Sequence, residues 1–155
     1  MLKETFLRDH ILPKDVLDKD VYSVYKKCET SHRSGLLYTH LVEALEDDPD
    51  YELWAEHYQW NGSFFEIPGL YVSSKGRLYD SVRGQFGELV QNEDTGYMEY
   101  HYETSLGKSD IEVHRAVGSV FVPSYIPIPM SQLQPVHKDL DPTNNNFNNL
   151  EWNRI

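Results

Sequence analysis

The chain has 155 residues, of which 39% are hydrophobic and 13% aromatic, and its 25 acidic side chains outnumber its 14 basic ones. This composition is typical of a folded globular protein and excludes a disordered chain. The net charge of −11 disfavours a general nucleic-acid binder, because such proteins gain most of their affinity by neutralising phosphates with a basic face.

The sequence offers neither a membrane segment nor a disulfide framework. No apolar run approaches the roughly 20 residues that cross a bilayer, and the first ten residues lack the apolar core of a signal peptide. Cys28 is the one cysteine, which favours a reducing compartment. We therefore expect a cytoplasmic protein that does not use a membrane.

Residues 1–60 are predicted to form an acidic helical region. Apolar side chains recur at helical spacing in 3–12, again in 13–28 after the interruption at Pro13, and in 36–48 before Pro49. The stretch YELWAEHYQW, residues 51–60, is predicted as a short fourth piece, and it leads to the turn signal Asn61-Gly62.

From residue 64 the pattern changes to short strands. FFEIPGLYVSSKGRLYDS, residues 64–81, alternates apolar runs with Pro68-Gly69 and Lys75-Gly76, which indicates tight hairpins. The sheet is predicted to continue through GELVQ, residues 87–91, and GYMEYHYETSL, residues 96–106, where Met98, Tyr100 and Tyr102 alternate with polar residues. DIEVHRAVGSVFV, residues 110–122, is predicted to begin as a strand and become helical at about Val113, ending before Pro123. The fold class predicted is therefore α+β, with a small antiparallel sheet after the helices.

Carboxylates crowd around aromatic side chains between residues 43 and 56. Such a run is usually a solvated helix end, but it is also the pattern of a protein-binding surface in which a charged rim steers a basic partner to aromatic anchors. The residues predicted to bind a partner in this way are Glu46, Asp47, Asp48, Asp50 and Trp54.

Three linked segments carry a family resemblance. FFEIPGLYVSSKGRLYDS resembles the module that precedes the nuclease domain of phage and intron HNH homing endonucleases. VHRAVGSVFVP, residues 113–123, is similar to the helix-opening segment that follows, and VHKDLDPTNNNFNNLEW, residues 136–152, aligns with the HNH core pattern. The resemblance implies a domain at 61–155, with the module at 63–81 and the HNH-like core at 111–155. It also implies a phage protein that works in a bacterial host cell.

The resemblance implies a site in which a hairpin histidine deprotonates water beside one divalent cation. By position, His137 is the general base and Asn149 is the partner that orients it. Asn144, Asn145 and Asp139 are implied to shape the loop between the two strands. The other histidines, His101 among them, show no convergent spacing.

Two departures from the family pattern predict a vestigial site without a metal. The family's metal-binding Asp or Asn stands directly before the histidine, and here that position is Val136, which has no donor atom. The second family ligand lies on a helix after Leu-Glu-Trp, where this sequence stops at Ile155. The predicted fold is thus an HNH-like ββα remnant without its last helix. Asp139 and Asp141 are weak candidates for a substitute metal site, since Asp also closes turns.

Three functions stay open at this point. The favoured one is a degenerate HNH-like protein without cofactors that is not an enzyme and inhibits or modulates a host or phage protein of nucleic-acid metabolism or defence. The first alternative is an active, Mg²⁺-dependent DNA-nicking endonuclease. The second is a DNA-binding regulator whose cations are Lys75, Arg77, Arg83 and Arg115.

Overall fold

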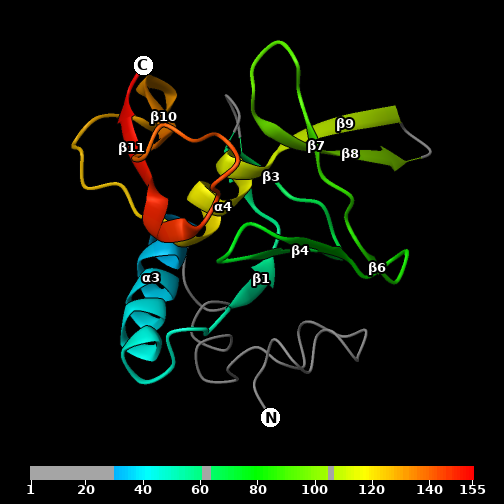
Figure 1. Cartoon of the computed structure of the whole chain (residues 1–155). Coiled ribbons are helices and arrows are strands. Elements are labelled where there is room, and N and C mark those ends of the chain that lie inside the picture. The colour runs from blue at the N-terminus through cyan, green and yellow to red at the C-terminus, as the bar shows by residue number, and fades with distance from the viewer. Residues whose placement is uncertain (1–29, 61–63, 105–106) are drawn as a thin grey trace.

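The computed structural model describes residues 30–60, 64–104 and 107–155. The predicted helices in 3–12 and 13–28 lie outside these described residues. Within them the fold is α+β, as predicted, and it is arranged around one central helix (Figure 1). That helix, α4 (Val113–Phe121), is buried along most of its length.

Strands of the described residues form four small antiparallel sheets. One sheet has the order β1-β4-β5-β6, and another has the order β7-β8-β9; β2 pairs with β3, and β10 pairs with β11. The bounds are β1 (Trp54–Glu56), β2 (Gln59–Trp60), β3 (Phe64–Phe65), β4 (Leu70–Ser73), β5 (Leu78–Asp80), β6 (Gln85–Phe86), β7 (Val90–Gln91), β8 (Met98–Thr104), β9 (Gly107–Glu112), β10 (Leu133–His137) and β11 (Leu150–Arg154).

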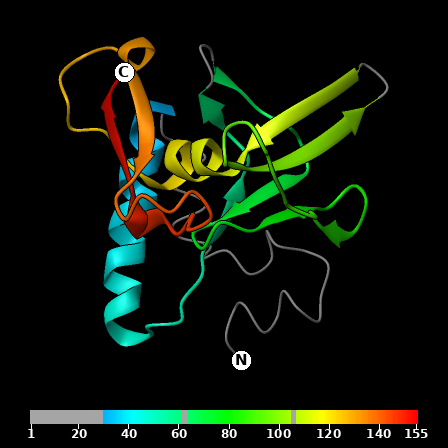
Figure 2. The same ribbon diagram turned by 45° about the horizontal axis from the view of Figure 1, so that its top comes forward.

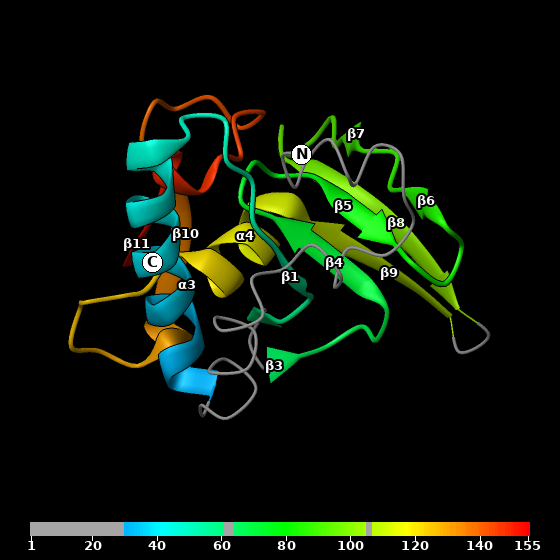
Figure 3. The ribbon, with the colours of Figure 1, turned by 90° about the horizontal axis from the view of Figure 1, so that it is seen from below.

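Helix α4 separates two layers. Figure 2 shows it between the β10–β11 hairpin on one side and the strands of the two larger sheets on the other. It contacts β4, β8 and β9 as well as β10 and β11. Helix α3 (Thr30–Asp47) packs on α4 beside the hairpin, which Figure 3 shows from below. Short 3₁₀ turns, η2 (Met130–Gln132) and η3 (Phe147–Asn149), precede β10 and β11.

The switch from strand to helix at Val113 is confirmed, because β9 ends at Glu112 and α4 begins at the next residue. The hairpin predicted at Lys75-Gly76 is confirmed, because β4 pairs with β5. The hairpin predicted at Pro68-Gly69 is wrong, because this turn joins β3 to β4, and β3 pairs with β2 instead. Gly69 and Gly76 both have positive φ, at 82° and 88°, a backbone conformation that glycine adopts without strain. Gly76 makes the tight turn between the paired strands β4 and β5.

The helical prediction for 51–60 is wrong, because this stretch forms β1 and β2. Trp54 lies opposite Ser73 and Glu56 opposite Tyr71, so β1 is the edge strand of the sheet that contains the 64–81 module. Pairing with β4 and burial of Leu53, Trp54 and Ala55 outweigh the weak local helical pattern of so short a segment.

Among the residues that the structure describes, no helix combines the length and apolar character that crossing a membrane requires.

Candidate functional site

The β10–β11 hairpin places His137 on the inner side of the molecule. Leu133, Pro135 and His137 alternate as buried residues along β10, as the period of a strand requires. His137 pairs with Leu150 across the hairpin, and Val136 pairs with Glu151. Trp152 fixes the hairpin to the end of α4, because its Nε1 donates to the backbone oxygen of Val122 at 2.7 Å.

Asn145 orients His137, and the prediction that Asn149 does so is corrected. The Asn145 Oδ1 atom lies 2.7 Å from His137 Nε2, while the Asn145 amide nitrogen donates to Pro142 O at 3.4 Å. This second bond turns the amide oxygen toward the imidazole, so Nε2 carries the hydrogen. His137 Nδ1 is then the basic nitrogen, as a proton acceptor requires.

Asn149 closes the loop instead. Its amide nitrogen donates to Asp139 Oδ1 and to Asn144 O, both at 2.9 Å, and its oxygen accepts from Asp139 N at 3.2 Å. The Asn144 amide donates to Asp139 Oδ2 at 2.8 Å. The physical reason for the exchange of roles is the path of the loop: η3 directs Asn149 toward the turn at Asp139, and Asn145 reaches the imidazole.

These two asparagines should therefore respond differently to substitution. We expect Asn149→Ala to lower the free energy of unfolding by about 2–3 kcal/mol, because a buried side chain with three hydrogen bonds is lost, one of them to a carboxylate. Asn145→Ala should cost only about 1 kcal/mol, since it removes one strong bond. Urea denaturation measures both losses of stability. NMR of the His137 ring should in addition show changed tautomer populations in Asn145→Ala. Equal losses of stability would contradict the assignment.

Asp139 and Asp141 are occupied by the turn, which disfavours a substitute metal site. Hydrogen bonds from the Asn144 amide, the Asp141 backbone and the Asn149 amide hold the pKa of Asp139 below its usual value. The Thr143 hydroxyl and backbone N–H hold the pKa of Asp141 low in the same way. Within the described ranges, the cluster of His, Asp and Glu side chains close enough to share a metal ion lies on β8 and β9, away from these residues.

Two further rings surround His137. The His114 ring is 5.2 Å from that of His137, and Tyr97 lies 4.2 Å from His114 and 6.1 Å from His137, measured between centroids. Burial, and then the proximity of His137 and Arg115, lowers the pKa of His114 to about 3. His114 is therefore a neutral ring at pH 7 and supplies no positive charge to the site. The role of Tyr97 had no signal in the sequence beyond its aromatic character.

His114 is buried at the start of α4. Its Nδ1 atom has no hydrogen-bond partner within the part of the chain that the structure describes. The ring contacts with Tyr97 and His137 thus hold this side chain by packing.

The 64–81 module supports the loop that carries Asn145. The Phe147 backbone N–H donates to Ser74 O at 2.8 Å. A Cβ atom placed on Gly76 would lie 2.8 Å from Asn145 Cβ and 2.9 Å from Asn145 O, so the loop rests directly on the glycine. The module and the HNH-like core, which were recognised separately in the sequence, are therefore in contact at this point.

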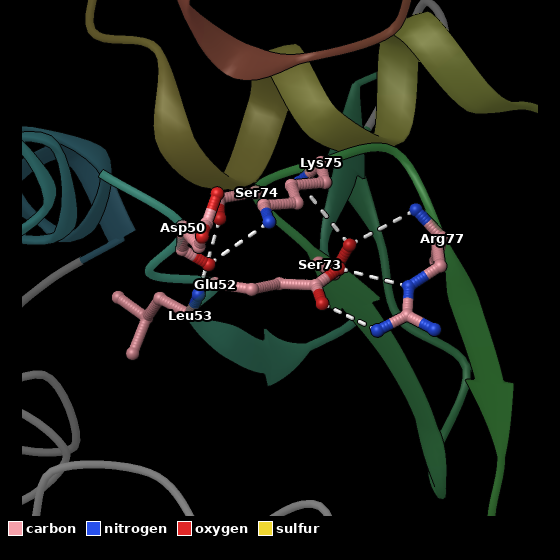
Figure 4. Close-up of polar contacts among 7 residues, drawn as sticks. All are labelled: Asp50, Glu52, Leu53, Ser73, Ser74, Lys75 and Arg77. Carbon is pink, nitrogen blue, oxygen red and sulfur yellow. Dashed lines mark hydrogen bonds and ion pairs between the residues drawn. The ribbon is translucent and has the colours of Figure 1, made fainter. Parts of the chain in front are cut away.

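A buried polar corner stabilises that turn (Figure 4). The Ser73 hydroxyl accepts from the Lys75 and Arg77 backbone N–H groups, and the Ser74 hydroxyl accepts from Leu53 N at 3.1 Å. Arg77 donates through two nitrogens to both oxygens of Glu52, whose side chain is 1% exposed.

All four cations proposed for DNA binding have partners inside the protein. Arg77 binds Glu52, Arg83 Nη1 lies 2.8 Å from Asp80, Arg115 Nε lies 2.9 Å from Glu112, and Lys75 Nζ donates to Asp50 O at 2.9 Å. Carboxylates neutralise three of these charges, which leaves little of the excess positive potential that phosphates require.

The structure separates the acidic residues from the tryptophan predicted beside them. Glu46, Asp47 and Asp50 are exposed and Asp48 is half-buried at the end of α3. Trp54 is 1% exposed and cannot anchor a partner, so that prediction is wrong. The cause is strand pairing, which turns Trp54 into the core beneath the guanidinium of Arg77, 5.3 Å from its ring.

Comparisons with known proteins were made with the sequence and with the fold. No family model matches the sequence, and a search of curated proteins found no match either. A search of solved structures found the complex described as DNA binding and cleavage by the HNH homing endonuclease I-HmuI, with a TM-score of 0.49 and 24% identity. The match covers 65% of this chain and 52% of that one, so the chain spans about half the length of that endonuclease.

Proposed function

We propose that this protein is an HNH-like scaffold that does not cleave nucleic acid and acts by binding another protein. The observation that carries the proposal is the chemistry around His137. The residue before it is Val136, the nearby carboxylates of Asp139 and Asp141 are occupied by hydrogen bonds, and the adjacent ring of His114 is neutral.

A lone histidine is a poor nuclease. His137 Nδ1 is able to accept a proton from water, but the charge that develops on a phosphate needs a cation or several donors to stabilise it. A hard divalent ion takes several oxygen ligands, and Val136 supplies none. Both oxygens of Asp139 and the Oδ1 atom of Asp141 already accept hydrogen bonds within the loop. The retained base and its partner Asn145 are then part of the packing of the hairpin.

The acidic C-terminal end of α3 favours a partner protein with a basic surface. Glu46 and Asp47 lie in the last turn of this helix, and that turn carries no basic residue. Negative charge at the C-terminal end of a helix opposes the helix dipole and costs stability, typically about 0.3–1 kcal/mol per charge. A surface that retains such unfavourable charges is suited to a role in binding, and the target we propose is a host or phage protein of nucleic-acid metabolism or defence.

The absence of catalysis can be tested directly. Supercoiled plasmid incubated with the protein and Mg²⁺ or Mn²⁺ is expected to show no nicking above the background of buffer and metal. The control is His137→Ala, which should be indistinguishable from the wild type. Nicking by the wild type that disappears in His137→Ala would overturn the proposal and establish the nicking endonuclease.

The binding surface can be tested with charge-matched variants. In the first, Glu46, Asp47 and Asp50 are replaced by lysine; in the second, the exposed Glu88, Glu93 and Asp94 are replaced by lysine. Both variants change the net charge equally. Capture from a bacterial lysate, followed by mass spectrometry, should recover the same stoichiometric partner with the wild type and the second variant only. Recovery of no such partner, or equal loss in both variants, would refute the surface assigned to α3.

A further inference from the structure

Three metal-binding side chains converge on one face of the β8–β9 hairpin. Glu99 and His101 are two residues apart on β8 and so share a face, and Asp110 lies directly opposite His101 on β9. His101 Nε2 is 3.3 Å from Glu99 Oε1 and 3.8 Å from Asp110 Oδ1. The ligand atoms of all three lie within 4.8 Å of one another.

The charges of this cluster favour a cation. The cluster has two carboxylates and one imidazole, so its net charge is negative whether His101 is protonated or not. Two further acidic residues share this face. Glu103 lies opposite Lys108, and Glu112 lies opposite Glu99 but is paired with Arg115 at 2.9 Å. Arg115 therefore neutralises Glu112, and the excess negative charge remains on Glu99 and Asp110.

Asn92 prepares Glu99 for coordination. Its amide nitrogen donates to Glu99 Oε2 at 3.2 Å, which leaves Oε1 directed at His101. Glu99 is buried, whereas the side chains of His101 and Asp110 are 59% and 64% exposed. A carboxylate held by an outer hydrogen bond is the usual support of a metal ligand, and the two exposed ligands leave the centre open to ions from solution.

We propose that Glu99, His101 and Asp110 form a Zn²⁺-binding site. One imidazole nitrogen and two carboxylate oxygens form a donor set typical of Zn²⁺, whereas Mg²⁺ and Ca²⁺ prefer oxygen alone. Ligands about 2.0–2.2 Å from a tetrahedral zinc lie roughly 3.3–3.6 Å from one another. The separations of 3.3 and 3.8 Å around His101 Nε2 need only a small side-chain adjustment to reach this geometry. Water completes the fourth position.

This site is distinct from that of His137. Tyr97, which contacts the His114 and His137 rings, precedes Glu99 by two residues and His101 by four. At about 3.4 Å per residue, these ligands lie roughly 7 and 14 Å further along the strand. The zinc site is therefore expected to bind metal whether or not His137 takes part in any chemistry.

The test is titration of the untagged, full-length protein with zinc sulfate, followed by isothermal calorimetry and by NMR of the histidine rings. We expect one bound Zn²⁺ and a shift of the His101 ring signals. His101→Ala and Asp110→Asn should each weaken binding more than about tenfold, and Asn92→Ala should weaken it about 10–100-fold as the loss of an outer-shell bond does. Circular dichroism of each variant checks that the hairpin is intact.

Matched carboxylates on other elements provide the control. Asp47→Asn at the end of α3 and Glu151→Gln on β11 change exposed acids outside the cluster and should leave zinc affinity within about twofold, because a single distant surface charge contributes little. The proposal is overturned if the wild type binds no Zn²⁺, if it prefers Mg²⁺ or Ca²⁺, or if Asp110→Asn and Asp47→Asn weaken binding equally.

Discussion

Replacing Arg77 by alanine is expected to lower the free energy of unfolding by about 3 kcal/mol, as urea denaturation would measure. Arg77 holds both oxygens of Glu52, and the Glu52 side chain is 1% exposed. Without Arg77 a buried carboxylate has no counter-charge, a change that typically costs about 3–5 kcal/mol. The lower end applies because Arg77 is itself 40% exposed. The guanidinium also packs on the rings of Trp54 and Phe86, and this contact is lost with it.

A second arginine provides a matched control for this prediction. Arg83 pairs with Asp80, whose side chain is also 1% exposed. Asp80, however, keeps hydrogen bonds from Val82 N and the Tyr100 hydroxyl when the arginine is removed. Arg83→Ala should therefore cost only about 1 kcal/mol. Adding Glu52→Gln to Arg77→Ala should recover part of the loss, because the uncompensated charge is gone. An Arg77→Ala loss no larger than that of Arg83→Ala would contradict the assigned role of Glu52.

Local patterns were sufficient to predict the elements that local chemistry determines. The change of period at Val113 is visible in the sequence because strand and helix repeats differ, and Gly69 and Gly76 are visible because their backbones need positive φ. Helix α3 was predicted from its apolar spacing, and it begins earlier than the 36–48 pattern indicated.

Features that depend on distant contacts could not be predicted in the same way. Trp54–Glu56 and Gln59–Trp60 are strands because β4 and β3 are available as partners. The pairing with β4 also buries Trp54. Among the consecutive asparagines, only the path of the loop over Gly76 determines that Asn145 and not Asn149 reaches His137. Asp110 lies beside Glu99 and His101 because of the register in which β8 and β9 pair. The spacing of histidines along the sequence does not reveal that register.

Replacement of Gly76 by alanine is expected to affect both stability and the geometry at His137. Gly76 has φ 88°, which costs an L-residue about 1–2 kcal/mol. The added Cβ would also lie 2.8 Å from Asn145 Cβ and 2.9 Å from Asn145 O, closer than real contacts of this kind. Because the neighbour includes backbone, relief requires a shift of the loop. We expect the free energy of unfolding to fall by about 2–4 kcal/mol in total.

The displaced loop carries the amide that orients the imidazole, so Gly76→Ala should also weaken the bond between Asn145 and His137 Nε2, which is 2.7 Å long in the wild type. NMR of the His137 ring should then show a mixture of tautomers. The matched control is Gly35→Ala in α3, where no described atom lies within 4 Å of the added Cβ. There alanine should stabilise the helix by about 0.5–1 kcal/mol and leave the His137 ring unchanged. A loss of stability in Gly76→Ala with an unaltered His137 tautomer would mean that the module supports the fold without positioning the histidine.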